Sequence, residues 1–262
     1  MVESDRLKTA RKGVEAGGRI AMHYFRKGGI IAREKKTASD IVTEVDEKSG
    51  KEIISIISRD FPDDSILTEE EEFMERKSEF TWIVDDIDGT NPFRFGLPNF
   101  GISVGCLYKG EPYLGAINLP FYKEVYSAEK GKGAFLNNTK INVNKIEELK
   151  KARLCIDYGH FGFRRKDLLD TGAKLIENCL YIDSYGCAVE GLCFVACGRV
   201  SAYLHHRAYP WDYCAGTVIV QEAGGKVTDH QGKALDWTKK DNMFILASNR
   251  FLHEQILSLI KK

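Results

Sequence analysis

The chain has 262 residues, with 38 lysines and arginines, 38 aspartates and glutamates and no formal net charge at neutral pH. The absence of a basic excess argues against nucleic acid or an anionic membrane surface as a partner. The first residues, M-V-E-S-D-R, lack an apolar signal segment, and no apolar run is long enough to span a bilayer. The seven cysteines include no C-x-x-C pair, which predicts reduced thiols and a cytoplasmic location.

The pattern of the chain predicts a mixed α/β protein, an α+β sandwich whose two halves differ in character. From residue 1 to 145, helical stretches are followed by an antiparallel meander, whereas from 146 to 262 strands and helices alternate. We therefore expect an N-terminal half with a mainly antiparallel sheet and a smaller C-terminal α/β half, with no flexible linker between them.

The expected elements follow from apolar periodicity and from capping and turn residues. The first half is predicted to contain a helix from Ser4 or Asp5 to Gly28-Gly29, strands at Ile30–Arg33 and Ile41–Thr43, a helix from Asp46 to Phe61-Pro62, and strands at Ile66-Leu67, Trp82–Val84, Ile102–Tyr108, Tyr113–Leu119 and Glu124–Ala128. The second half is predicted to contain strands at Leu154–Asp157, Leu180–Ser184, Ala202–Leu204, Val227-Thr228 and Phe244–Ala247, and helices at Asp167–Asn178, Ala188–Cys197, Asp212–Ala223 and Phe251–Ile260.

The most informative stretch is 81–92, T-W-I-V-D-D-I-D-G-T-N-P. Its apolar run ends in Asp85, Asp86 and Asp88, and such crowded carboxylates repel one another and resist burial. A divalent cation offsets that cost, and hard oxygen ligands favour magnesium. Glu69 follows another short strand, and strand ends of α/β proteins converge on one crevice. The alternative interpretation is a strand that ends in a polar Asp-Gly turn.

Four motifs in this order resemble the inositol monophosphatase family, which includes archaeal and bacterial members that hydrolyse fructose 1,6-bisphosphate. They are Asp46 after I-V-T-E-V, Glu69-Glu70 after I-L-T, the D-x-I-D-G-T of Asp85–Thr90, and W-D-x-x-A-G with E-A-G-G from Trp211 onward. The resemblance covers almost the whole chain. It implies a layered α/β/α/β/α fold, a magnesium-dependent phosphatase with lithium sensitivity, a role in carbohydrate metabolism, and a homodimer.

The resemblance also assigns roles to individual residues. It implies two or three Mg²⁺ ions per site, with Mn²⁺ as a possible substitute: Glu69, Asp85 and the carbonyl of Ile87 hold the first, Asp85, Asp88 and Asp212 hold the second, and Glu69 helps hold a weaker third. Asp46 and Thr90, with Glu69, are the implied catalytic residues that orient and deprotonate water, while Asp88, Gly89-Thr90 and Gly186-Cys187-Ala188 are the implied phosphate and substrate contacts. A helix that begins at Ala188 would favour an anion there, because its first N–H groups are unpaired.

The chain departs from the family pattern at several of these positions. Asp86 replaces the usual proline and adds a negative charge, so we expect only weak inhibition by lithium. Cys187 stands where serine or threonine is common. His205 replaces a glutamate that binds sugar hydroxyls in inositol-preferring members. With His206 and Arg207, in a short loop before Asp212, it predicts a pocket for a second phosphate, with fructose 1,6-bisphosphate as the leading substrate.

Several alternatives remain at the level of sequence. Asp86–Thr90 also spells D-x-D-G-T, the motif of haloacid dehalogenase-type phosphatases, with Asp86 as nucleophile and Asp88 as general acid. Its partner motif G-D-x-x-x-D is absent. Within the inositol monophosphatase family, NADP and 3′-phosphoadenosine 5′-phosphate are alternative substrates, and a non-catalytic metal- or phosphate-binding relative is a further possibility. We expect His160, Lys239-Lys240 and the rest of the glutamate run after Thr68 to be solvated surface.

Overall fold

The structure is a computed structural model, and it describes residues 3–27, 32–34, 41–71, 73–158, 165–237 and 243–261. The statements below concern these residues. Three sequence predictions lie outside them: the helix stop at Gly28-Gly29 and the assignments of His160 and Lys239-Lys240 to the surface.

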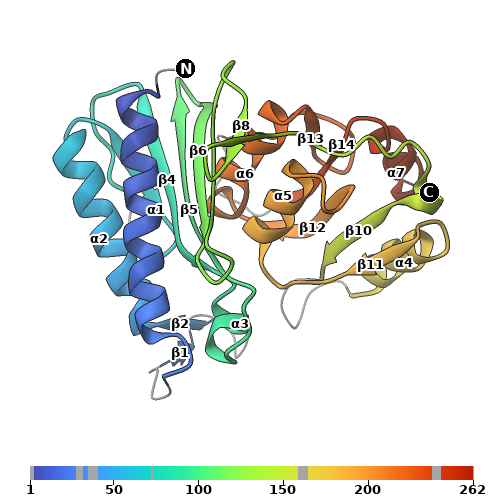
Figure 1. Cartoon of the computed structure of the whole chain (residues 1–262), viewed down its shortest axis with the longest axis horizontal. Coiled ribbons are helices and arrows are strands. Elements are labelled where there is room, and N and C mark those ends of the chain that lie inside the picture. The colour runs from blue at the N-terminus through green and yellow to red at the C-terminus, as the bar shows by residue number, and fades with distance from the viewer. Residues whose placement is uncertain are drawn as a thin grey trace.

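The described elements form five layers, which run from left to right in Figure 1. Helices α1 and α2 cover one face of a seven-stranded sheet, and helices α5 and α6 lie between that sheet and a five-stranded one. Helices α4 and α7 cover the outer face of the second sheet. The predicted α/β/α/β/α layering is therefore confirmed.

The outer helices of the first half begin at residues whose side chains satisfy free backbone N–H groups. Ser4 caps α1 (Asp5–Tyr24) by accepting from the N–H of Leu7, as predicted. Helix α2 (Glu44–Asp60) begins two residues earlier than predicted, because Thr43 is its N-cap and Asp46 occupies the third helical position. The short strands β1 (Ala32–Glu34) and β2 (Ile41–Thr43) pair antiparallel beside this start.

The seven-stranded sheet has the order β3-β4-β5-β6-β7-β8-β9, with β3 parallel to β4 and the other pairs antiparallel. Strand β4 is longer than predicted: it continues through the carboxylates to Asp88, and its pairing with β5 becomes irregular between Asp85 and Asp88. The strands are β3 (Ser65–Thr68), β4 (Phe80–Asp88), β5 (Gly101–Tyr108), β6 (Glu111–Leu119), β7 (Glu124–Glu129), β8 (Ala134–Leu136) and β9 (Thr139–Ile141).

The five-stranded sheet has the order β11-β10-β12-β14-β13. Strand β12 runs to Ala208 rather than to Leu204, because it pairs with β14 beyond an irregularity after His205. The strands are β10 (Arg153–Asp157), β11 (Tyr181–Asp183), β12 (Ala202–Ala208), β13 (Gly225–Thr228) and β14 (Met243–Asn249), with helices α3 (Thr90–Arg94), α4 (Arg165–Ile176), α5 (Ala188–Ala196), α6 (Pro210–Glu222) and α7 (His253–Ile260), and a 3₁₀ turn at Leu149–Lys151.

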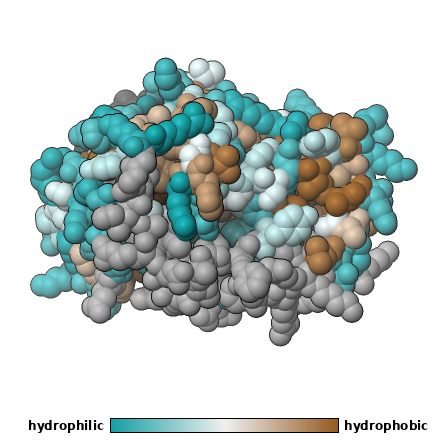
Figure 2. Space-filling view, turned by 90° about the horizontal axis from the view of Figure 1, so that it is seen from below, coloured by the Kyte–Doolittle hydropathy of each residue, from teal (hydrophilic) through white to brown (hydrophobic). Residues whose placement is uncertain are grey.

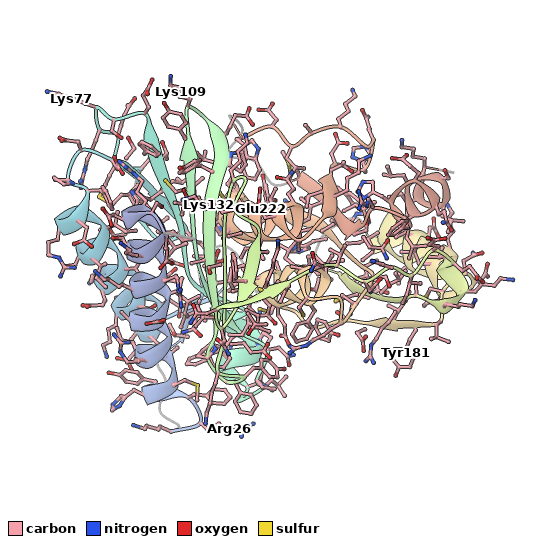
Figure 3. The ribbon with its side chains drawn as sticks, turned by 45° about the horizontal axis from the view of Figure 1, so that its top comes forward. Arg26, Lys77, Lys109, Lys132, Tyr181 and Glu222 are labelled. Carbon is pink, nitrogen blue, oxygen red and sulfur yellow. The ribbon has the colours of Figure 1, made fainter. Side chains whose placement is uncertain are left out.

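Helix α6 joins the two sheets, and small residues let it approach the first one closely. A Cβ atom added at Gly115 of β6 would lie 2.5 Å from the carbonyl oxygen of Ala215 in α6. At the end of α6, Glu222 accepts from the N–H groups of Gly131 and Gly133, over 2.8 and 2.7 Å, and so holds the β7–β8 turn. Figure 3 shows Glu222 beside Lys132 of that turn. The element that bears Asp212 is thereby fixed against the sheet that bears Asp85.

Two general expectations can be compared with the described residues. All seven cysteines lie within them and are free, five buried and two half-buried, which confirms the prediction of reduced thiols. A search of the described helices finds none with the length and apolar character that a membrane span requires.

Candidate active site

The end of β4 brings three carboxylates together with one from α6. Ligand oxygens of Asp85, Asp88 and Asp212 all lie within 4.8 Å of one another, although Asp212 comes from the second half of the chain. Asp85 is only 1% exposed, and neither of its carboxylate oxygens has a hydrogen-bond partner in the part of the chain that the structure describes. A buried carboxylate without donors is costly unless a cation or a proton compensates its charge.

A second group of oxygens shares Asp85. Oxygens of Glu69, at the end of β3, and of Asp85 and Asp86 on β4 also lie within 4.8 Å of one another. Every donor in both groups is a carboxylate oxygen, and magnesium prefers such ligands. The residues present therefore fit a divalent cation, with Asp85 common to both groups.

The acidic groups affect one another's protonation. Burial, followed by the charges of Glu69, Asp88 and Asp212, raises the pKa of Asp85 well above its usual range. Burial likewise raises the pKa of Asp86, with the nearby carboxylates of Asp46 and Glu69 adding to the effect. Burial also raises the pKa of Asp88, to about 7. In the absence of cations this site therefore holds protons at a pH where isolated carboxylates are ionised.

Asp46 and Thr90 meet beside the carboxylates. The hydroxyl of Thr90 donates over 3.1 Å to Oδ1 of Asp46 and lies 3.0 Å from the carbonyl oxygen of Ile87. The other oxygen of Asp46 accepts from the N–H of Thr43 over 2.9 Å and from the Thr43 hydroxyl. Burial raises the pKa of Asp46 to about 6, against the opposite effect of these hydrogen bonds. The carboxylate of Asp46 is thus fixed in orientation, and its pKa of about 6 lies close to neutral pH.

Gly89 makes the sharp turn from β4 into α3, a short helix that the sequence did not predict. Its φ is +84°, in the left-handed region that glycine adopts without strain. A Cβ atom there would lie 2.5 Å from the carbonyl oxygen of Asn99. Both the conformation and the lack of space require glycine, and the turn places Thr90 at the first position of α3.

The N-terminus of α5 faces the same carboxylates. Oδ2 of Asp88 accepts from the N–H of Val189 over 2.7 Å and lies 3.2 Å from the sulfur of Cys187, the N-cap residue. The N–H of Gly186 donates to Asp157 over 2.9 Å. That amide therefore already has an acceptor in this structure, and Gly186 stays, with Cys187 and Ala188, in the segment predicted to contact phosphate. The role of Gly186, with φ of +67°, is to shape the turn.

Two buried acids that the sequence did not single out support this turn. Asp157, at the end of β10, accepts from Ser184, Tyr185 and Gly186 through one oxygen and from Tyr203 through the other. Glu190, on α5, accepts from Asn99 over 3.0 Å, which ties the helix to the loop after α3. Burial raises the pKa of Glu190 to about 7. For Asp157 the sequence signal is its position as an acid at the end of an apolar run. For Glu190 the sequence contains no such signal.

The basic cluster lies on β12 rather than in a loop after it, and its two histidines point to different neighbours. The ring of His205 lies near Tyr203, with centroids 6.1 Å apart, whereas His206 packs edge-on against Phe244 of β14 at 4.7 Å. Tyr203 contacts the inner helix α5, since a Cβ at Gly191 would lie 2.3 Å from its ring. His205 therefore shares the inner face with Tyr203, whereas His206 lies against β14.

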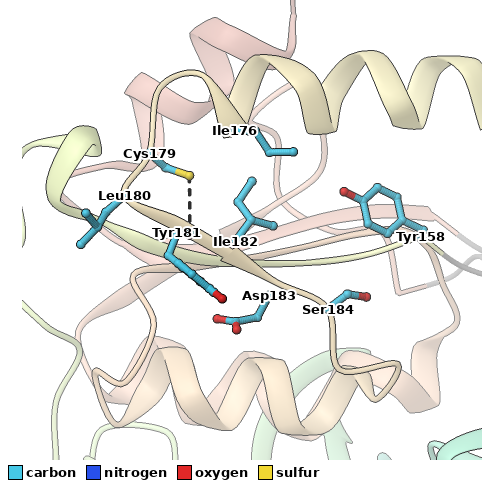
Figure 4. A pocket seen from close by; sticks show the side chains of 8 residues that line it. All are labelled: Tyr158, Ile176, Cys179, Leu180, Tyr181, Ile182, Asp183 and Ser184. Carbon is cyan, nitrogen blue, oxygen red and sulfur yellow. Dashed lines mark hydrogen bonds between the residues drawn. The ribbon is translucent and has the colours of Figure 1, made fainter.

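An open pocket of about 400 Å³ lies away from the carboxylates, beside β11 (Figure 4). Leu180, Tyr181 and Tyr158 are among its lining side chains. Its one carboxylate, Asp183, is held by Arg153 over 2.5 and 2.8 Å. The charged side chain among these lining residues is thus already paired, and the pocket contains none of the clustered carboxylates.

Comparison with known proteins agrees with the fold. The sequence model of the inositol monophosphatase family matches residues 3–262. The fructose-1,6-bisphosphatase/inositol-1-monophosphatase of Thermotoga maritima is 36% identical over 98% of this chain and 96% of its own length. The Nus factor SuhB of Pasteurella multocida is 36% identical over 86% of this chain and 84% of its own. The crystal structure of the extragenic suppressor protein suhB of Bartonella henselae superposes with a TM-score of 0.94, at 28% identity and 99% coverage of both chains.

The chain belongs to the inositol monophosphatase family, a family of magnesium-dependent phosphatase hydrolases. The alternative of a haloacid dehalogenase-type phosphatase is therefore wrong. Its nucleophile would be Asp86, which is 3% exposed and lies against Gly50 of α2.

Proposed function

We propose that this chain is a magnesium-dependent phosphomonoesterase that hydrolyses inositol 1-phosphate, fructose 1,6-bisphosphate or both. The observation that supports this most directly is the Thr90–Asp46 hydrogen bond of 3.1 Å, which lies beside carboxylates suited to a divalent cation. Phosphoryl transfer needs charge neutralisation and an oriented nucleophile more than covalent help from the protein. The described site offers groups for both tasks.

The cation ligands follow from the two carboxylate groups. Glu69, Asp85 and the carbonyl of Ile87 would hold one Mg²⁺ ion, and Asp85, Asp88 and Asp212 would hold another, with Glu69 assisting at a weaker third. When bound, these ions supply positive charge that lowers the pKa of water and stabilises the phosphate and the leaving oxygen. Mn²⁺ is a possible substitute, because it accepts the same oxygen ligands.

The protein's own groups handle the proton. Asp46 has a pKa of about 6, so it is mainly ionised at neutral pH and can accept the proton of the Thr90 hydroxyl. The hydroxyl oxygen of Thr90 is then able to accept a proton from a water molecule in turn, which makes that water more nucleophilic. The amides of Cys187 and Ala188 at the start of α5 would bind the phosphate, as would Gly89 and Thr90.

The choice of substrate depends on β12. His205 stands where inositol-preferring members of the family have a glutamate that binds sugar hydroxyls, and the guanidinium of Arg207 could bind two phosphate oxygens at once. We therefore favour fructose 1,6-bisphosphate over inositol 1-phosphate. NADP and 3′-phosphoadenosine 5′-phosphate are the alternative substrates within the same reaction class.

A panel of these four compounds tests the proposal. Purified protein should release inorganic phosphate from at least one of them when Mg²⁺ is present and should lose that activity when the metal is chelated. Asp85→Asn serves as the inactive control, since Asn keeps the shape of the side chain. Failure to release phosphate from all four, by a folded protein with Mg²⁺, would leave a non-catalytic metal- or phosphate-binding relative as the better interpretation.

The basic residues of β12 can be tested separately. Arg207→Ala should raise KM for fructose 1,6-bisphosphate about tenfold, the effect of one charge-assisted hydrogen bond. It should hardly change KM for inositol 1-phosphate. His206→Ala is the matched control, because that ring faces Phe244 and should leave both KM values unaltered. An equal response of both substrates to Arg207→Ala would show that the cluster does not recognise the second phosphate.

We also propose that the protein is a cytoplasmic homodimer. Each copy of the chain would consist of two halves, residues 1–145 and residues 146–262. Support for a second copy comes from four apolar side chains that are 60% to 67% exposed on α4 and around β11, an edge strand of its sheet. Figure 2 shows a region of hydrophobic residues, in brown, at the right of the molecule. The four are Leu169, Ile176, Leu180 and Tyr181. Light scattering should give a dimer for the wild type and a monomer for Leu180→Lys; a monomeric wild type would contradict the proposal.

A further inference from the structure

Asp86 is a buried acid that the proposed reaction leaves without a role. It is 3% exposed, and among the described residues its Oδ2 atom has no hydrogen-bond donor. The main chain at this residue is held in place, because the hydroxyl of Ser49 in α2 donates to the Asp86 carbonyl over 3.0 Å. A ligand oxygen of Asp86 lies within 4.8 Å of those of Glu69 and Asp85. The side chain is thus directed into a group of like charges.

Two acids that this chain buries for structural reasons, Asp64 and Asp157, are surrounded by donors instead. Asp64 is 2% exposed, and its carboxylate accepts four hydrogen bonds, from Arg6 (two, each 3.1 Å), Ser78 (2.6 Å) and Trp82 (3.0 Å). Asp157 is similarly supplied, with three bonds to one oxygen and one to the other. Asp86 is buried to the same extent without such compensation, which points to a missing positive charge rather than to a structural role.

The space for this carboxylate is provided by a glycine inside a helix. A Cβ atom at Gly50 of α2 would lie 3.1 Å from Oδ2 of Asp86 and 3.5 Å from its Cβ and Cγ atoms. Glycine within a helix is unfavourable compared with alanine, since the unfolded chain gains freedom from it. At this position it leaves the Asp86 side chain unobstructed on the side facing α2.

We propose that Asp86 is a cation ligand, which adds a third carboxylate to the divalent cation expected at Glu69 and Asp85. Each additional carboxylate raises the affinity of an oxygen site for a hard cation. The inference rests on the proposed function only in that both require a divalent cation at this edge of the sheet. It adds a residue to the site and implies that this cation binds more tightly than two carboxylates alone would hold it.

A calorimetric titration of the substrate-free protein with Mn²⁺ tests the assignment. The same titration is repeated with Mg²⁺. Asp86→Asn keeps the shape and removes the charge, and we expect it to weaken one binding step at least tenfold. The same variant should unfold at a higher temperature than the wild type without metal, because the folded wild type must either bury a charge at Asp86 or take up a proton there that the unfolded chain does not hold. Glu71→Gln is the matched control, an exposed acid of the same run that should change neither quantity.

Gly50→Ala gives an independent variant that keeps every charge. Its added Cβ atom would press on the carboxylate from 3.1 Å, so cation binding should weaken while the helix itself becomes more favourable. Binding isotherms of Asp86→Asn that match the wild type within twofold would overturn the assignment and make Asp86 a protonated structural acid. A wild type that binds neither cation would overturn the proposed function as well, so the two failures are distinguishable.

Discussion

The hydroxyl of Thr90 lies 3.1 Å from Oδ1 of Asp46, although 44 residues separate them in the chain. Asp46 is fixed by the cap of α2 and Thr90 by the turn at Gly89, so the pair depends on two helix starts meeting. The hydroxyl has a single proton and also lies 3.0 Å from the carbonyl of Ile87. A cation at that carbonyl would direct the proton toward Asp46, which couples the metal ligands to the acid–base pair.

Thr90→Ala should lower turnover by about two orders of magnitude, the usual contribution of a general acid–base group. It should leave the affinity for Mg²⁺ nearly unchanged, because the threonine hydroxyl is not proposed as a ligand. Thr90→Ser restores the hydroxyl and should recover most of the rate. Steady-state kinetics together with metal titration separate the two quantities. A loss of metal affinity as large as the loss of rate would mean that Thr90 belongs to the metal site.

Asp88→Asn should reduce the rate at least 100-fold, the cost of losing a strong electrostatic contact in the transition state. The amide oxygen of Asn can still accept from the N–H of Val189, so the start of α5 should remain intact. Circular dichroism and thermal unfolding provide that control. Activity within threefold of the wild type would contradict the assignment of Asp88 as a metal ligand.

The stability of the metal-free protein should fall as the pH rises from about 4 to about 7. Burial raises the pKa of Asp46 from 3.8 to about 6 and that of Asp88 to about 7, so the folded state binds protons that the unfolded state has already released. Mg²⁺ competes with those protons and should therefore raise Tm more at pH 8 than at pH 5. Thermal unfolding with EDTA and with Mg²⁺ across this range measures both trends. A Mg²⁺ effect that is larger at pH 5 would reverse the expected sign.

Asp157→Asn tests the support of the phosphate-binding turn. The amide would place an NH₂ group against donors that now bind a carboxylate, which should loosen the chain before α5. We expect about a tenfold weaker inhibition by inorganic phosphate and a higher KM, with a smaller change in kcat. Asp183→Asn is the control, because its partner Arg153 lies away from the carboxylates. Rates and constants unchanged by Asp157→Asn would remove it as a positioning residue.

Local chemistry in the sequence predicted two α/β halves of different character and the crowding of Asp85 and Asp88, whereas the layered fold and the meeting of these two with Asp212 were implied by the resemblance to the inositol monophosphatase family. Periodicity and caps depend on neighbours along the chain, so the sequence displays them. The predicted C-terminal ends of β4 and β12 were wrong, because both strands continue further than their local sequence indicates. Pairing with β5 keeps Asp88 in β4, and pairing with β14 keeps Ala208 in β12, despite the polar residues before them. Pairing of that kind depends on distant segments and outweighs local preference.

Residues whose role arises from distant contacts were missed for the same reason. Asp157 receives donors from the segment before α5, 27 to 29 residues along the chain, and from Tyr203 on a neighbouring strand. Glu190 meets an asparagine 91 residues away. Neither contact has a signal in a single sequence, because only the packed layers bring the partners together.

Helix α6 belongs to the second half of the chain but packs on the first sheet at Gly115. Its first turn carries Asp212, which lies with Asp85 and Asp88 in one of the two clusters of carboxylates. A cation shared by Asp85 and Asp212 would therefore connect the seven-stranded sheet to helix α6. Without it, repulsion between those acids that are ionised would weaken the contact of the first turn of α6 with the end of β4. The rate of amide hydrogen exchange in that turn would then report whether the cation is bound. We expect slow exchange with the cation and faster exchange without it, and this measurement does not require the enzyme to turn over.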